Sequence, residues 1–337
     1  MKQNIPFTKL NIKNNIFVNL KNIFRSGILS HGSFTSNFEK EFSNFTKIKY
    51  CTTVANCTAG LHLICLALNL KKNDEVIVPA MTHAATGHAV EYTGAKAKFV
   101  DVNPINGNIN YNDLKNKITS KTKAVIVVHV AGKSCDMSKI IKICNKNKIF
   151  LIEDCAHSLG TIHKNKHVGS FGVAGAFSFY PTKQITTGEG GMVVSNNKQF
   201  IKKISSLKAF GLNKQPSARK INGQYDIKSL GYNYRISEIS SAIGLHQLLS
   251  YDEKLILRKK KALRYIKNLS KSDKITIPEY SEDDSYFIFQ FLFKNSKQRL
   301  KTISLLKKNK IGYSIHYATP LPFLSYYKKK YPYYKRE

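Results

Sequence analysis

Two segments of the sequence end an apolar stretch in side chains that can carry acid–base and nucleophilic chemistry. The first ends at the carboxylate of Asp154 and is followed three residues later by the imidazole of His157. The second carries the hydroxyl of Ser178 and ends at the amine of Lys183. Ligands of open parallel sheets bind at the carboxyl ends of strands. These four side chains are therefore the first candidates for a functional site.

An amine, an acid and several hydrogen-bond donors are the groups that pyridoxal phosphate requires from a protein. Lys183 would bind the aldehyde as a Schiff base and, once displaced by substrate, move a proton between substrate carbon and cofactor. Asp154 would keep the ring nitrogen protonated, and His157 would bond the phenolic oxygen. Ser178 and Thr58, with backbone amides at the start of a helix, would donate to the phosphate. The residue types thus predict an enzyme that transfers amino groups.

Each of these residues also has an ordinary structural explanation. An aspartate that ends a strand is more often a helix cap or a loop residue, and Lys183 is one of 54 Lys and Arg residues. The run Gly188–Gly191 lacks the ending of a phosphate loop and leads into a strand pattern, so it is interpreted as a tight turn near the cofactor. Only the conjunction of acid, imidazole, hydroxyl and lysine favours the cofactor site.

The elements that would position these residues alternate between strand and helix. Short apolar runs predict buried strands at 75–79, 97–102, 124–130, 149–154, 175–180 and 192–195. Amphipathic stretches with a polar first residue predict helices at Thr58–Leu70 and Asp136–Lys148. Such alternation predicts an α/β fold with a mostly parallel sheet that is covered on both faces.

The residue pattern changes in the second part of the chain. A polar stretch from Asn213 to Asp226 precedes one long helical pattern from Ser237 to about Leu269. Strand patterns at 274–277 and 286–293 and a helix at 297–309 then indicate a small α+β unit. We therefore expect an N-terminal arm at 1–30, a large cofactor-binding domain at 31–250 and a small C-terminal domain at 251–337.

The formal net charge of the 337-residue chain is +33, which would ordinarily suggest a nucleic-acid partner. The lysines are spread along the whole chain, and no helix-turn-helix, zinc-finger or aromatic RNA-binding pattern accompanies them. We interpret the charge as a solvated surface that also attracts a doubly anionic substrate, and we expect no nucleic-acid partner. A DNA-binding regulator remains the alternative from another class.

Cysteines, histidines and hydropathy argue against several further classes. The six cysteines stand singly in apolar stretches and the ten histidines form no metal-binding spacing, so we expect reduced thiols and no metal. The first residues lack the apolar run of a signal peptide, and no window is apolar enough to span a membrane. A cytoplasmic protein without membrane insertion is the expectation.

Eight motifs together resemble the DegT/DnrJ/EryC1/StrS family of pyridoxal-phosphate-dependent sugar aminotransferases. They stand in the family's order at Gly32–Glu39 (GSFTSNFE), Ala55–His62 (ANCTAGLH), Asp74–His83 (DEVIVPAMTH), Glu153–His157 (EDCAH), Ser178–Lys183 (SFYPTK), Thr186–Gly191 (TTGEGG), Leu230–Arg235 (LGYNYR) and His316-Tyr317. The resemblance implies a fold-type-I homodimer with a large, mostly parallel seven-stranded sheet and a smaller α+β domain.

The resemblance also implies individual roles. Lys183 matches the Schiff-base lysine, and Asp154 and His157 match the partners of the ring nitrogen and phenolic oxygen. His83 stands where the family stacks an aromatic ring on the cofactor. Further cofactor contacts fall on Thr58, Ser178, Cys57, which replaces a glycine, and Asn233, which reaches across from the neighbouring subunit. Substrate contacts are expected from Tyr180, Arg235, His316 and Tyr317.

The lysine itself distinguishes two chemistries within the family, because members that dehydrate deoxysugars carry histidine at the position of Lys183. Aminotransfer from L-glutamate to a nucleotide-linked keto-sugar is therefore expected, with a 4-keto-6-deoxyhexose for a surface polysaccharide as the leading substrate. A 3-keto-sugar or a keto-inositol is the alternative. Pro322 replaces a second histidine of many relatives, and the sequence stops at Glu337. On the resemblance this is a shortened small domain, and a catalytically impaired homologue is a further alternative.

Overall fold

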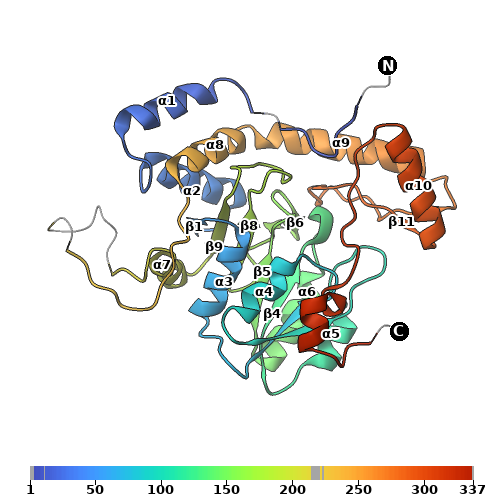
Figure 1. Ribbon diagram of the computed structural model, residues 1–337, viewed down its shortest axis with the longest axis horizontal. Helices are drawn as coiled ribbons and strands as arrows, with labels where there is room; N and C mark the ends of the chain where they lie inside the picture. Colours follow the sequence, from blue (N-terminus) through green and yellow to red (C-terminus); the bar gives the residue numbers. More distant parts are fainter. Residues whose placement is uncertain (1–3, 11, 214–220, 222–223, 336–337) are drawn as a thin grey trace.

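The computed structural model describes residues 4–10, 12–213, 221 and 224–335. Its centre is a seven-stranded sheet with the order β1-β9-β8-β5-β4-β2-β3 (Figure 1). The strands are β1 (Tyr50–Val54), β2 (Glu75–Pro79), β3 (Lys96–Val100), β4 (Thr122–Val128), β5 (Phe150–Asp154), β8 (Ala174–Ser178) and β9 (Gly191–Ser195). Strand β9 runs antiparallel to both of its neighbours, β1 and β8, and the other neighbouring strands pair in parallel. The mostly parallel seven-stranded sheet expected from the sequence is thereby confirmed.

Strand β1 is the one strand of this sheet that apolar runs did not predict. Its sequence includes Thr52 and Thr53, which are both buried. Glu39 accepts hydrogen bonds from the backbone and hydroxyl of Thr53, at 2.7 and 2.9 Å, while the buried amine of Lys208 donates to Thr52 at 2.6 Å. Because these threonines are satisfied by polar partners, β1 is buried without an apolar pattern.

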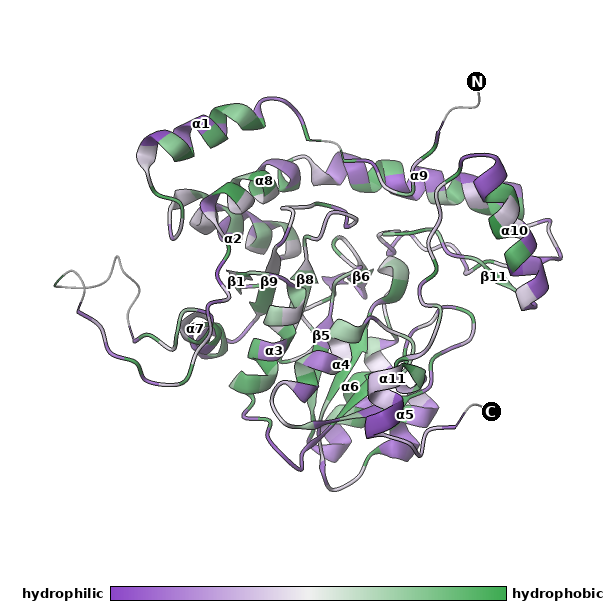
Figure 2. Ribbon diagram, viewed as in Figure 1, coloured by the Kyte–Doolittle hydropathy of each residue, from purple (hydrophilic) through white to green (hydrophobic). Residues whose placement is uncertain are grey.

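Alternate residues of each strand contact different layers of helices. In β2, Val76 and Val78 join the core cluster that contains α3 (Cys57–Ala67), α4 (Ala84–Glu91) and α7 (Lys198–Leu207). Ile77 between them joins the cluster that contains α5 (Tyr111–Lys117) and α6 (Met137–Asn147). Figure 2 shows the strands around β4 coloured mainly hydrophobic. The sheet is thus covered on both faces, as the strand and helix alternation predicts.

The helices near the N-terminus pack beside the two helices that follow the sheet. Helix α2 (Ser33–Thr46) inserts Phe38 and Phe42 into a core cluster with Phe177 of β8, and α1 (Ile16–Ser26) packs against α8 (Glu238–Leu248). Figure 1 shows α1, α8 and α9 (Tyr251–Leu269) along one side of the sheet domain. These helices place the start of the chain next to its second half.

The long helix expected from Ser237 to Leu269 is in fact two helices, α8 and α9, with a break at Leu249 and Ser250. The break directs Tyr251 into the core, where it is fully buried and its hydroxyl donates to the Leu159 carbonyl at 2.8 Å. The periodicity of apolar residues continues through the break, so the sequence pattern alone did not show it.

The C-terminal part consists of small elements. These are the two-stranded sheet of β10 (Ile275–Thr276) and β11 (Leu292–Phe293), α10 (Ser296–Lys308), a short 3₁₀ turn at Leu321–Phe323 and α11 (Ser325–Lys330). The strand expected at 286–293 is limited to its last two residues, because the stretch before it crosses to the large domain. A hairpin of β6 (Ile162–His163) and β7 (Lys166–His167) completes the strands.

The last described residues pack against the large sheet domain. Leu321, Tyr327 and Tyr331 belong to the same core cluster as α3 and α4, and the Tyr327 hydroxyl lies 2.9 Å from Nδ1 of His88. The proposed division into arm, large domain and small domain remains a prediction, and this contact shows that the segment after α10 returns to the sheet. Within the described part of the chain, no helix is both long and apolar enough to cross a bilayer.

Candidate active site

The polar candidates of the sequence lie where neighbouring strands end. Asp154 is the last residue of β5 and pairs in register with Ala176 of the parallel strand β8, which ends at Ser178. The chain then turns, with the Lys183 N–H donating to the Tyr180 carbonyl at 2.9 Å. The Lys183 amine is close enough to the Asp154 carboxylate for that charge to raise the pKa of the lysine, against the larger effect of burial. The structure therefore places an acid and an amine together at the carboxyl edge of the sheet.

Asp154 is buried, and each of its carboxylate oxygens accepts a hydrogen bond from an oxygen or nitrogen donor. One carboxylate oxygen accepts from the Thr86 hydroxyl at 2.8 Å and the other from the Ala156 N–H at 3.1 Å. Thr82 in turn bonds Thr86, with 2.9 Å between the hydroxyl oxygens. Sequence reasoning missed Thr86, and the available signal was the spacing of two threonines by four residues across the start of α4.

Lys183 has the environment of a reactive amine. Burial lowers the pKa of Lys183 to about 8, and Cys57 and Asp154 only partly oppose that effect. The amine lies 4.6 Å from the ring centre of Phe287, which the C-terminal part of the chain contributes. A lysine whose pKa is lowered in this way is neutral, and hence nucleophilic, over a wider pH range than an exposed lysine.

His157 is buried beside this amine and lacks a partner for one ring nitrogen. Its ring stacks on Phe287 with 4.5 Å between centroids, and Nδ1 has no hydrogen-bond partner among the described residues. Burial, followed by the charge of Lys183, lowers the pKa of His157 well below its ordinary value. A neutral imidazole with a buried unsatisfied nitrogen fits an absent polar group such as the phenolic oxygen of pyridoxal phosphate.

The start of α3 forms the part of the site that fits a phosphate. Asn56 caps the helix by accepting from the Ala59 N–H at 2.8 Å, so Cys57 and Thr58 belong to its first turn. Gly191, which pairs with Ser178, touches this turn: a Cβ on Gly191 would lie 2.8 Å from the Cys57 nitrogen. The expected helix began at Thr58, and the observed one begins one residue earlier. Helix amides, a threonine and a serine therefore meet at one edge of the sheet.

Cys57 also faces the acid. Its sulfur lies 3.9 Å from a carboxylate oxygen of Asp154 and 3.4 Å from the Ala176 carbonyl. Burial raises the pKa of the Cys57 thiol well above its ordinary value, and Asp154 raises it further. The residue is thus a neutral thiol that fills space beneath the site, which differs from a nucleophilic thiolate.

Three further candidates reach the site from other segments. His83 caps α4 by accepting from the Ala85 N–H at 3.2 Å, and its exposed ring lies 6.1 Å from that of Tyr317. His316 lies 5.9 Å from the His157 ring and 6.3 Å from Phe7 of the N-terminal segment. Burial lowers the pKa of both histidines, while burial and then Asp154 raise the pKa of Tyr317. The candidates His83, His316 and Tyr317 thus line the same region as Lys183.

Three sequence candidates lie elsewhere. Asn233 is exposed and accepts from Nε of Arg235 at 2.9 Å. The guanidinium of Arg235 packs over the Phe210 ring at 5.1 Å. Tyr180 exposes 48 % of its surface, although it stands only three residues before Lys183. Substrate roles of Tyr180 and Arg235 and the cofactor role of Asn233 therefore remain predictions.

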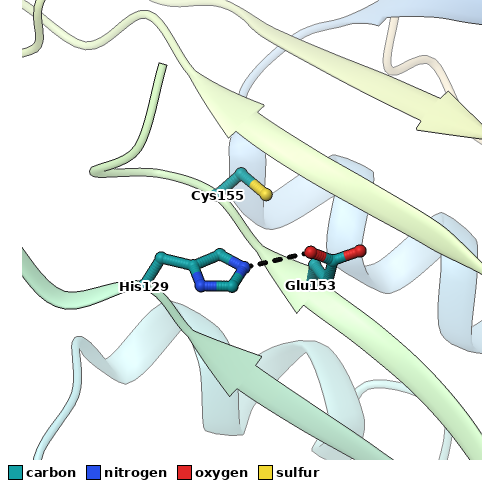
Figure 3. A group of neighbouring side chains, drawn as sticks. All are labelled: His129, Glu153 and Cys155. Carbon is teal, nitrogen blue, oxygen red and sulfur yellow. Dashed lines mark hydrogen bonds and ion pairs between the residues drawn. The ribbon is translucent and has the colours of Figure 1, made fainter. Parts of the chain in front are cut away.

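Behind Asp154 lies a second polar cluster, His129, Glu153 and Cys155, whose potential ligand atoms all fall within 4.8 Å of one another (Figure 3). The acceptor oxygens of Glu153 and both ring nitrogens of His129 already have hydrogen-bond partners. Glu153 accepts from His129 Nε2 at 3.1 Å and from three backbone N–H groups at 169, 171 and 172, each at 2.7 Å. His129 Nδ1 accepts from the Cys135 N–H at 3.1 Å. The cluster is a hydrogen-bond network that fixes the end of β5 and needs no metal ion.

The mostly parallel seven-stranded sheet gives the chain the fold of the fold-type-I pyridoxal-phosphate-dependent transferases. The DegT/DnrJ/EryC1/StrS aminotransferase family matches residues 10–337. The chain therefore belongs to this family, as its motifs indicate, and it is an aminotransferase.

Individual relatives resemble the chain over most of its length. GDP-perosamine synthase of Escherichia coli O157:H7 is 36% identical over 312 residues, which cover 90% of this chain and 82% of that protein. UDP-4-amino-4,6-dideoxy-N-acetyl-beta-L-altrosamine transaminase of Campylobacter jejuni is 33% identical, covering 96% and 86% respectively. Among solved structures, the PLP form of the putative sugar aminotransferase Spr1654 from Streptococcus pneumoniae superposes with a TM-score of 0.89 at 28% identity, covering 97% of this chain and 88% of that chain.

Proposed function

We propose that this chain binds pyridoxal phosphate at Lys183 and transfers an amino group from L-glutamate to a nucleotide-linked keto-sugar. The observation that carries the proposal is that Lys183, Asp154 and His157 lie together. In addition, the buried Nδ1 of His157 has no hydrogen-bond partner among the described residues, which leaves it available for a cofactor oxygen. The carboxylate would meet the ring nitrogen, the imidazole the phenolic oxygen, and the first turn of α3 with Ser178 the phosphate. Bound pyridoxal phosphate supplies an electron-accepting ring that stabilises negative charge on the substrate carbon.

The residues of this chain supply the remaining functions. The amine of Lys183 can take a proton from the substrate carbon and return it, because its lowered pKa gives it a larger neutral fraction near physiological pH than an exposed lysine has. Thr86 holds the Asp154 carboxylate in place, and the exposed ring of His83 offers a face for stacking. Each part of the site therefore performs binding, orientation or proton transfer with groups that the fold already positions.

The substrate class rests on the relatives together with the charge of the chain. Both relatives named above carry a nucleoside diphosphate sugar in their names, and one name specifies a 4-amino-4,6-dideoxy product. A net charge of +33 favours attraction of a doubly anionic diphosphate. We therefore propose a nucleotide-linked 4-keto-6-deoxyhexose, for a surface polysaccharide, as the acceptor. A 3-keto-sugar or a keto-inositol would use the same proton-transferring residues.

Adding L-glutamate to the protein loaded with pyridoxal phosphate tests this proposal. The yellow band should disappear while 2-oxoglutarate forms in an amount equal to the active sites, and it should return when a suitable keto-sugar nucleotide is added. Parallel samples with a 4-keto-6-deoxyhexose nucleotide, a 3-keto-sugar nucleotide and a keto-inositol identify the acceptor. The proposal would be contradicted if the protein stayed colourless after loading with pyridoxal phosphate, or if adding glutamate left the yellow absorbance band unchanged.

We also propose that two copies of the chain share each site, with Asn233 contributed by the neighbouring subunit. The exposed position of Asn233 supports this, because its side chain is accessible to a second copy of the chain while its segment is held to the large sheet: the Ala55 N–H donates to the Tyr234 carbonyl at 2.8 Å. Exposed apolar side chains of Phe17, Phe24 and Leu230 offer surface for a homodimer.

Mixing two inactive variants tests the shared site. Lys183→Met and Asn233→Ala are each expected to abolish most activity, whereas random reassortment into mixed dimers should restore about a quarter of the wild-type sites. The fraction arises because half of the dimers are mixed and one of their two sites is intact. No recovery in mixtures that light scattering shows to be dimeric would mean that Asn233 acts within its own chain or not at all.

A further inference from the structure

Phe287 has no assigned role, yet it contacts the two groups on which the proposed chemistry depends. The side chain is 4% exposed. Its ring stacks on His157 with an interplanar angle of 23°, and the Lys183 amine lies 4.6 Å from the ring centre. His316 approaches the same ring edge-on at 6.2 Å. One aromatic ring thus borders both the imidazole and the amine.

The backbone that carries Phe287 is fixed from several directions. The Ser285 N–H donates to the Gly132 carbonyl at 2.9 Å, and the Ser285 hydroxyl accepts from Gln184, the neighbour of Lys183, at 3.2 Å. Nη1 of Arg258 on α9 donates to the Phe287 carbonyl at 3.2 Å. A Cβ at Gly132, whose φ is +89°, would lie 2.9 Å from the Phe287 nitrogen, so this close packing requires glycine.

We infer that Phe287 is a positioning residue of the active site: its ring holds the plane of the His157 imidazole and excludes water from the Lys183 amine. The positioning role of Phe287 rests on the proposed function of His157 and Lys183, whereas the contacts of its ring with both residues are independent of that function. Because Phe287 follows α9, the segment 284–287 must dock on the large domain before the site is complete. The C-terminal part of the chain is thereby linked to the reactivity of the lysine.

The charges around Lys183 determine what loss of the ring should do. The charge of the Lys183 amine interacts with the titratable side chains of Cys57, His83, Asp154, His157 and His316. Desolvation is the largest effect on both Lys183 and His157, and it lowers both pKa values. Admitting water through a truncated Phe287 should therefore raise both pKa values toward those of exposed residues.

The first experiment uses the full chain without cofactor or substrate. Labelling of Lys183 by an amine-reactive reagent is followed by peptide mass spectrometry across pH. In the wild type the rate should be half-maximal near pH 8, the pKa to which burial lowers this lysine. Phe287→Ala should move that midpoint upward by about one pH unit or more. The matched control is Phe289→Ala, since Phe289 stacks on Tyr265 of α9 at 4.8 Å, away from the lysine.

An unchanged midpoint in folded Phe287→Ala would overturn the inference. Because this measurement involves neither cofactor nor substrate, it can fail or succeed independently of the proposed function. Should the alanine variant not fold, Phe287→Leu carries the test, since it keeps an apolar side chain but lacks a flat face for His157. In the loaded enzyme that variant should lose about tenfold in kcat with little change in KM for glutamate. A change in KM alone, or none in kcat, would contradict a positioning role.

Discussion

Replacing Lys183 by methionine is expected to abolish the yellow band of the loaded protein and to lower transamination by about 1,000-fold. Methionine matches the length of the lysine stem but has no amine to bind the aldehyde or carry a proton. Absorbance after loading with pyridoxal phosphate and glutamate-dependent formation of 2-oxoglutarate are the two measurements. Lys198→Ala, at the exposed start of α7, is the matched control and should change neither.

The same variant should change how stability depends on pH. Burial lowers the pKa of Lys183 to about 8 in the folded protein, whereas the ordinary value of 10.5 applies to the unfolded chain. Between these values the unfolded state binds more protons, so this lysine makes the free energy of unfolding rise with pH. Its unfavourable contribution is present below pH 8 and disappears above 10.5.

Urea unfolding of the wild type and Lys183→Met over this pH range measures the difference. The wild type should gain stability relative to the variant as the pH rises, because only the wild type contains the buried amine. Other lysines, including the buried Lys208, contribute equally to both proteins. Parallel stability curves would show that the Lys183 amine is solvated, and they would remove the physical basis for its nucleophilicity.

The sequence contained enough information to predict the acid and the amine of the site. Asp154 ends one apolar strand and Lys183 follows another, and parallel strands bring their carboxyl ends to one edge of a sheet. Two residues that are distant in the sequence are therefore expected to be neighbours when each lies at the carboxyl end of a predicted parallel strand. The same reasoning gave most of the helix α3, because its apolar face is a local feature, although the observed cap is Asn56 and the expected start was Thr58.

The features that sequence reasoning missed have at most a weak local signal, such as the four-residue spacing of Thr82 and Thr86. Thr86 lies within α4, and only the folded chain shows that its hydroxyl meets Asp154. Phe287 resembles an ordinary strand residue, and its contact with His157 depends on a segment that docks after α9. The break before Tyr251 arises from burial of that side chain, and β1 is buried through polar partners of Thr52 and Thr53. Each case depends on a tertiary contact, which periodicity cannot encode.

Asp154→Asn is expected to lower kcat by about 100- to 1,000-fold, because an amide cannot stabilise a positive charge on the ring nitrogen as a carboxylate does. The fold should tolerate the change, since the asparagine oxygen can still accept from Thr86. Steady-state rates with glutamate, together with circular dichroism, measure the two effects. Asp252→Asn, an exposed acid in the first turn of α9, is the matched control.

Thr86→Val then separates the charge of Asp154 from its position. The variant retains the carboxylate but removes the donor that holds it at 2.8 Å, so a smaller loss of about tenfold is expected, comparable to one hydrogen bond to a charged group. The double variant Asp154→Asn with Thr86→Val should be no slower than Asp154→Asn alone, because the hydroxyl acts through the carboxylate. Additive losses in the double variant would instead show that Thr86 contacts cofactor or substrate directly, while full activity of Asp154→Asn would eliminate this carboxylate as the partner of the ring nitrogen.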